Sequence, residues 1–172
     1  MNLQRIILLT SLFSIACGSD PQSMMDGGTE PDAGTMEVEI GTGVDNFIPL
    51  TEGQAVDIIL GPQGGGRNGG FHIWHSVRTR NIHPENVLLK FETRVASTGQ
   101  LIATQERRAN LRPSGDDYVA HGIAPWLMDC CLAEDNDVRM AVEVIDDTGS
   151  MGSDARVVHA SFCVEGGFSV CP

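Results

Sequence analysis

Residues 138–145 read Val138-Arg139-Met140-Ala141-Val142-Glu143-Val144-Ile145, with valine or methionine at every second position from 138 to 144. Successive side chains of a β-strand point to opposite faces, so this repeat predicts a strand with one apolar face. Residues 87–95 show the same alternation, through Val87, Leu89, Phe91, Thr93 and Val95. These two stretches predict a domain built from sheets.

Shorter apolar runs, separated by turn residues, occupy most of the chain after Met36. They are residues 36–40, 44–50, 55–60, 71–80, 101–106, 117–123 and 155–164. No stretch carries an apolar stripe with the 3.6-residue period of a helix. With roughly eight or nine short strands, the sequence predicts an all-β fold, namely an antiparallel β-sandwich of the Greek-key or immunoglobulin-like kind. A closed barrel is the alternative.

A glycine-dense stretch stands directly before the run at residues 71–80. Six of the ten residues from Gly61 to Gly70 are glycine. The spacing Gly64-x-Gly66-x-x-Gly69 matches a dinucleotide-binding fingerprint, but that motif has to open a helix, and here a strand follows. Glycine in strand-rich chains marks turns and bulges, so we interpret the stretch as a structural loop in preference to a ligand cradle.

The strand after this loop has two different faces. We expect Phe71, Ile73, His75, Val77 and Thr79 to face the core. The other face carries the candidate binding surface, which consists of His72, Trp74, Arg78 and Arg80. An aromatic ring and two cations on an exposed face suit a sugar, a peptide or a partner protein. His72 and His75 are weak candidates for copper or zinc ligands, because a regular strand places them on opposite faces.

The chain is strongly acidic. It has 23 Asp and Glu against 11 Lys and Arg, for a net charge of -12. Nucleic-acid binding requires a basic face, so we expect no nucleic-acid partner. The acidic stretches 134–137 and 146–154 are weak candidates for calcium, which prefers oxygen ligands, although neither has EF-hand spacing. We interpret both as solvated loops.

The sequence shows no evident catalytic apparatus. Asp147-Thr148-Gly149-Ser150 resembles the aspartic-protease signature, but such enzymes need two aspartates that share a proton, and the chain has one copy of the motif. The motif also falls where a hairpin turn is expected. We predict no catalytic residues and no cofactor, and a hydrolase is a remote alternative.

The first 16 residues have the features of an export signal. Arg5 precedes an apolar segment, residues 6–15, which is short for a membrane-spanning helix. The following Ser14-Ile15-Ala16-Cys17 resembles the bacterial lipobox, with Ser14 in place of the usual leucine. The resemblance implies that Cys17 becomes the lipidated N-terminus and anchors the protein to the membrane. Gly18 follows Cys17, which in lipoproteins favours the outer membrane.

The chain is therefore expected to have three parts. Residues 1–16 are the signal peptide, residues 17–35 are the lipidated cysteine and an acidic linker rich in Gly, Pro, Asp and Ser, and residues 36–172 are the β-sandwich domain. Such a linker lacks the apolar content for a packed core and is expected to be disordered.

These features are together similar to uncharacterised envelope lipoproteins of myxobacterial-type bacteria. The resemblance rests on the lipobox, the acidic spacer, and Gly61-Pro62-Gln63-Gly64-Gly65 ahead of His72-Ile73-Trp74. It implies a place in the cell envelope, on the periplasmic face or at the cell surface, and no particular activity. We therefore expect a binding or structural module, whose partners are the membrane and an envelope protein or glycan. A metal-binding envelope protein, for copper, zinc or calcium, is the alternative.

Four cysteines remain after Cys17, namely Cys130, Cys131, Cys163 and Cys171. An even number in an exported domain predicts disulfides. A bond between the adjacent Cys130 and Cys131 would be strained, so we predict two bridges from this pair to Cys163 and Cys171, in either pairing. The alternative is a thiolate metal site, but adjacent cysteines lack the usual spacing of zinc ligands.

Overall fold

The computed structural model describes residues 34–61, 70–161, 164–165, 168–169 and 171. The chain divides into two units, Met1–Asp32 and Ala33–Pro172, and all described residues belong to the second. The predicted signal peptide, Cys17 and nearly all of the predicted linker lie outside the described residues. Within the described part of the chain, no helix is long and apolar enough to cross a membrane.

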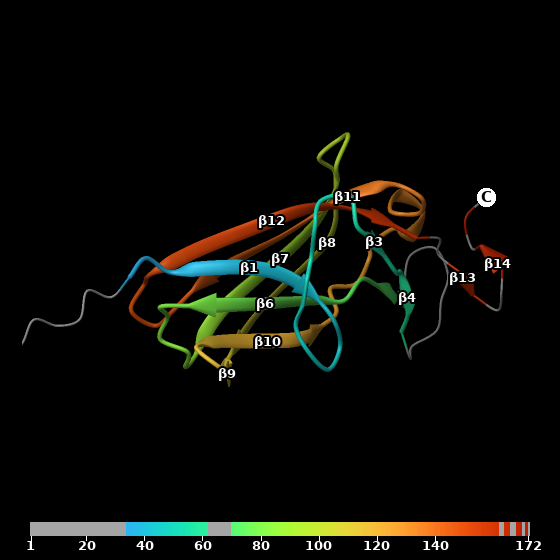
Figure 1. The fold of residues 1–172 in the computed structure, drawn as a ribbon. Coiled ribbons are helices and arrows are strands. Elements are labelled where there is room, and N and C mark those ends of the chain that lie inside the picture. Colours follow the sequence, from blue (N-terminus) through green and yellow to red (C-terminus); the bar gives the residue numbers. More distant parts are fainter. Residues whose placement is uncertain (1–33, 62–69, 162–163, 166–167, 170, 172) are drawn as a thin grey trace, which may run out of the picture. The chain divides into compact units, whose positions relative to one another are not determined.

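The fold is all-β, as the sequence predicts, and two five-stranded sheets form its body (Figure 1). The first sheet has the order β2-β1-β6-β10-β9. Its strands are β1 (Glu37–Thr42), β2 (Ile48–Pro49), β6 (His75–Arg80), β9 (Arg112–Ser114) and β10 (Asp117–Ile123). All of its neighbouring strands are antiparallel.

The second sheet has the order β3-β12-β11-β7-β8. Its strands are β3 (Ala55–Val56), β7 (Val87–Val95), β8 (Leu101–Ala109), β11 (Asp137–Ile145) and β12 (Met151–Ala160). β3 pairs with β12 in parallel, and the other pairs are antiparallel. The predicted antiparallel sandwich is therefore confirmed, with one parallel pair at this edge, where the two-residue β3 is added beside β12.

Two small ribbons and one helical turn complete the described chain. β4 (Ile59–Leu60) pairs with β5 (Phe71–His72), and β13 (Val164–Glu165) pairs with β14 (Phe168–Ser169). A 3-10 helix, η1 (Cys130–Leu132), begins after Asp129, whose carboxylate accepts a hydrogen bond from the Cys131 backbone N–H. This cap satisfies one of the N–H groups that a helix start leaves open.

The core lies between the two sheets and follows the alternation read from the sequence. Along β7 every second side chain from Val87 to Val95 is buried, and the intervening ones are half-buried. Along β11, Val138, Met140, Val142 and Val144 are buried in the same alternating way. Because one face of each strand is removed from water, the two-residue period fixes the register of the sheet.

The prediction for the inward face of residues 71–80 is confirmed. Phe71, Ile73, His75, Val77 and Thr79 are all buried. The predicted strand is nevertheless interrupted at Ile73 and Trp74, since β5 pairs with β4 whereas β6 pairs with β1 and β10. The chain changes strand partners between His72 and His75, so the two histidines belong to different sheets.

Candidate functional site

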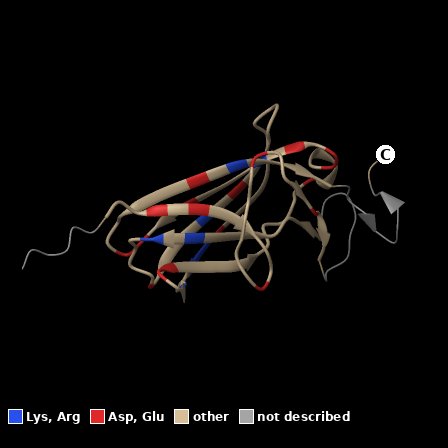
Figure 2. Cartoon of the chain, viewed as in Figure 1, with Lys and Arg blue, Asp and Glu red and all other residues tan. Residues whose placement is uncertain are grey.

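The candidate binding surface falls into two separate environments. Arg78 and Arg80 lie on the outer face of the first sheet, next to the acidic residues of β1 (Figure 2). Arg78 forms an ion pair with Glu39 and its guanidinium carbon stands 4.8 Å from the centre of the Phe47 ring. Arg80 donates to Asp117 at 2.8 Å. Both cations are thus already neutralised by carboxylates of this chain.

His72 does not share that exposed face. Its side chain is 4% exposed, and among the described residues neither ring nitrogen has a hydrogen-bond partner. Burial lowers the pKa of His72, because the charged imidazolium loses its hydration, and the neighbouring Gly70 backbone offsets part of this shift. The expectation of an exposed His72 is therefore wrong. The physical reason is the change of strand partners, which places His72 in the small β4–β5 ribbon.

Two tryptophans accompany His72. The rings of His72 and Trp74 meet edge to face, with centroids 4.5 Å apart. In the sheet, His72 stands directly opposite Ile59 of β4 in one antiparallel pair and directly opposite Trp126 in another. Directly opposite residues of an antiparallel pair project to the same face. We call Ile59, His72, Trp74 and Trp126 the tryptophan face.

This face is partly open to solvent. Trp126 is 50% exposed, and Trp74 is half-buried. Further exposed apolar side chains lie on the same segments, namely Leu60 on β4 and Met128 two residues after Trp126. Exposed aromatic and apolar side chains around a buried polar group are typical of a ligand site.

Glycine is required on both sides of the loop that joins β4 to β5. A Cβ atom on Gly61 would lie 2.8 Å from the carbonyl oxygen of Gly70, and Gly70 has a φ of +81°. A side chain is thus excluded from the first position and strained at the second. The predicted structural role of the loop holds at these two ends, and residues 62–69 between them lie outside the described residues.

His75 is a core residue. Its side chain is fully buried, Nδ1 lies 2.9 Å from the carbonyl oxygen of Ile73, and Nε2 lies 3.1 Å from Oγ1 of Thr93. Burial lowers its pKa to about 4. Both ring nitrogens have partners, so His75 offers no ring atom to a metal without breaking one of these bonds. A metal site shared by His72 and His75 stays a prediction, and the two hydrogen-bonded ring nitrogens of His75 do not favour it.

The Asp-Thr-Gly-Ser motif forms the hairpin turn between β11 and β12. Asp146, just before it, accepts hydrogen bonds at Oδ1 from the backbone N–H of Thr148 and Ser150 and from the Thr148 hydroxyl. Its other oxygen accepts from the His83 backbone N–H. Burial alone would raise the pKa of Asp146, but these bonds together lower it. The motif therefore serves a turn, which agrees with the expected hairpin.

The acidic stretch 134–137 is also in contact with a side chain of the protein. His159 places Nδ1 3.0 Å from Asp137 and Nε2 3.1 Å from Asp135. These two hydrogen bonds raise the pKa of His159. The carboxylates of Asp135 and Asp137, considered above as calcium ligands, are thus engaged by His159.

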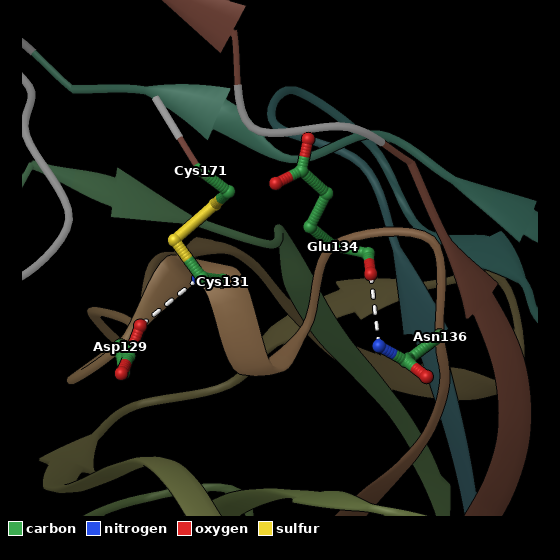
Figure 3. The surroundings of a disulfide bond; sticks show 5 residues. All are labelled: Asp129, Cys131, Glu134, Asn136 and Cys171. Carbon is green, nitrogen blue, oxygen red and sulfur yellow. Dashed lines mark hydrogen bonds between the residues drawn. A yellow bond between two sulfur atoms is a disulfide. The ribbon is translucent and has the colours of Figure 1, made fainter. Parts of the chain in front are cut away.

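One predicted disulfide is present between Cys131 and Cys171, which lie 40 residues apart in the sequence (Figure 3). This is one of the two pairings that the sequence left open for these residues. Cys130 is also disulfide-bonded, and Cys163 lies outside the described residues. The bridge ties the C-terminal end of the chain to η1.

Glu134 stands beside this disulfide (Figure 3). One carboxylate oxygen and the two sulfur atoms of Cys131 and Cys171 lie within 4.8 Å of one another. The sequence offered the thiolates and, separately, Glu134 within the acidic stretch 134–137. It did not predict their combination, since only the turn after η1 brings Glu134 to the cysteines. Metals bind thiolates, so these three residues form a possible metal centre only when the disulfide is reduced.

No protein-family model and no curated protein matched the chain in our comparisons.

Proposed function

We propose that this protein is a lipid-anchored binding module of the cell envelope, and that its ligand binds at the tryptophan face. The lipobox-like Ser14-Ile15-Ala16-Cys17 and the acidic linker support the anchor. The observation that carries the binding site is His72, a buried imidazole whose ring nitrogens have no hydrogen-bond partner in the described part of the chain. A buried polar group without a partner costs about 1–3 kcal/mol, so its presence calls for a compensating role.

The ligand class that suits this face is a glycan. The apolar face of a sugar ring stacks on an indole, as Trp126 offers, and a hydroxyl group supplies the partner that His72 lacks. Both His72 nitrogens are covered, so ligand binding requires a neighbouring side chain to move. Trp74, whose ring meets that of His72, is the candidate for this movement. The neutral state of His72 allows it to donate at one nitrogen and accept at the other.

Intrinsic fluorescence provides a direct test, because the chain has two tryptophans and both belong to the tryptophan face. The full chain is titrated with an oligosaccharide of N-acetylglucosamine, and we expect a saturable change in emission. Trp126→Ala should weaken binding by about 2- to 10-fold through loss of one aromatic contact. Met151→Ala, which truncates an exposed apolar side chain on β12, is the matched control and should bind normally.

A second substitution separates a ligand group from a structural one. His72→Phe keeps an aromatic ring and removes the two unpartnered nitrogens, so we expect lost binding with an unfolding free energy equal to or above that of the wild type. Normal saccharide binding by His72→Phe, or no fluorescence change in the wild type, would refute the glycan site.

Metal binding is the second candidate, and the trio of Cys131, Glu134 and Cys171 favours it. Metal content is measured on the same preparation with and without a dithiol reductant. Zinc or copper bound only after reduction, and lost in Glu134→Gln, would support this function. Absence of metal in both samples would exclude it.

A further inference from the structure

Arginines without a carboxylate partner lie close together at one edge of the sandwich. The described cations that pair with Asp or Glu are Arg78, Arg80, Lys90, Arg94 and Arg156. Arg107, Arg108, Arg112 and Arg139 form no such pair with any described residue. Three of these four fall within six positions of a chain whose net charge is -12.

Arg107 and Arg112 line the same small groove. Its volume is about 130 Å³, and Arg107 of β8, Asn110, Arg112 of β9 and His121 of β10 contribute to its wall. No carboxylate is among the lining residues. This groove is therefore a local positive region in an acidic protein.

The topology explains why a groove exists here. β9 pairs with β10 only as far as Arg112 and Val119. Residues 120–123 of β10 continue beyond β9, so no described strand covers them on that edge. β8 is the edge strand of the other sheet. Residues 110 and 111 connect β8 of the second sheet to β9 of the first, so the two sheet edges face each other at this point.

Arg107 is directed toward this gap by the register of β8. It is paired with Leu89, which is fully buried. Because opposite residues share a face, Arg107 belongs to the core-facing side of β8, yet it is exposed. A charge on that side of an edge strand hinders pairing with another chain. A single arginine is enough to hinder such pairing. That role does not account for Arg112 and His121, which line the groove together with Arg107.

We propose that this groove binds a phosphate group. A guanidinium donates two parallel hydrogen bonds to a phosphate and stays protonated at every physiological pH. The groove is smaller than the roughly 300 Å³ of an ordinary small-molecule pocket, so it holds one anionic group. Distant carboxylates are screened beyond about 8 Å at physiological ionic strength, so the local arginines decide the sign of the potential.

This phosphate site is independent of the tryptophan face, with which it shares no residue. Free inorganic phosphate and the headgroup of an anionic phospholipid present the same chemistry. Both are therefore used as probes. The lipid probe is dihexanoylphosphatidylglycerol below its micelle concentration, and dihexanoylphosphatidylcholine is its zwitterionic control.

The experiment follows the NMR signals of Arg107, Arg112 and His121 in the full chain during titration with each probe. We expect saturable shifts with inorganic phosphate, and about tenfold weaker binding in Arg107→Ala and in Arg112→Ala. The matched control is Arg108→Ala, since Arg108 neighbours Arg107, donates to the Asn86 carbonyl at 3.0 Å and does not line the groove. Its affinity should equal that of the wild type.

The outcomes divide clearly. Tighter binding of the anionic lipid than of phosphate, with the same arginine dependence, identifies a headgroup site, and equal or weaker lipid binding identifies a site for free phosphate. Either result supports the proposal. No saturable shift with inorganic phosphate, or an equal loss in Arg108→Ala, overturns it. Melting temperatures of the three variants are measured as a control, to establish that each variant is folded.

Discussion

The hydroxyl group of Thr93 lies 3.1 Å from Nε2 of His75 inside the core, and this contact joins β7 of one sheet to β6 of the other. Nδ1 of His75 lies 2.9 Å from the Ile73 carbonyl oxygen. A carbonyl can only accept, so Nδ1 carries the proton and Thr93 donates to Nε2. The fully buried ring is thus satisfied in its neutral form.

Thr93→Val should lower the free energy of unfolding by about 1–3 kcal/mol, because valine has the shape of threonine and leaves Nε2 without a donor. Urea denaturation measures the loss. Thr104→Val changes an exposed threonine of β8 and should stay within about 0.5 kcal/mol of the wild type. Equal stability of the two variants would contradict the role given to Thr93.

Stability should fall as the pH decreases from 6.5 to 4. The pKa of His75 is about 4 in the folded chain against 6.5 for the free side chain, so within this range the unfolded chain binds a proton that the folded chain excludes. The loss is on the order of 3 kcal/mol. The lowered pKa of His72 acts in the same direction.

Urea denaturation at several pH values of His75→Phe tests this effect. The variant should show a smaller loss of unfolding free energy between pH 6.5 and 4. His83→Asn, at an exposed histidine, should keep the slope of the wild type. An unchanged slope in His75→Phe would assign the pH dependence to other groups.

Asp146→Ala should destabilise the turn between β11 and β12. It removes the acceptor of hydrogen bonds from Thr148, Ser150 and His83, and we expect a loss of roughly 1–3 kcal/mol. Because the folded pKa of Asp146 is lowered, its contribution is present above the ordinary carboxyl pKa and is lost as the pH falls through the folded value. Asp147→Ala, at the exposed neighbouring carboxylate, should have little effect.

Cys131→Ser should lower the free energy of unfolding by about 2–4 kcal/mol, since the bridge to Cys171 closes a loop of 40 residues. Alkylation and intact mass without reductant should find no free thiol among Cys130, Cys131, Cys163 and Cys171. Free thiols together with a stoichiometric metal would replace the disulfide interpretation by a metal centre.

Much of the sheet could be predicted because its signal is local. The period of two in β7 and β11 marks the buried face directly, and the inward face from Phe71 to Thr79 follows from the same rule. The break at Ile73 and Trp74 carries no comparable signal. It arises because β5 pairs with β4 and β6 pairs with β1, and pairing between distant segments leaves no mark in a short window of sequence.

The candidate site shows the same division. Trp74 and His72 could be selected as a polar and aromatic pair from their spacing, but Trp126 could not, since 54 positions of sequence separate it from His72 and a single bridge brings them together. The groove of Arg107 and Arg112 likewise depends on two sheet edges meeting. Glu134 joins Cys131 and Cys171 only through the turn after η1.

By itself, the sequence determined the all-β class, the apolar faces of the long strands and the tie between the adjacent cysteines and the end of the chain. Tertiary structure alone decided that His72 is buried with no hydrogen-bond partner among the described residues, and that Arg78 and Arg80 are neutralised. It also decided that Arg107 and Arg112 form no ion pair with a described carboxylate. The physical reason is that burial follows from local periodicity, whereas the partners of a polar group are set by which distant strands lie beside it.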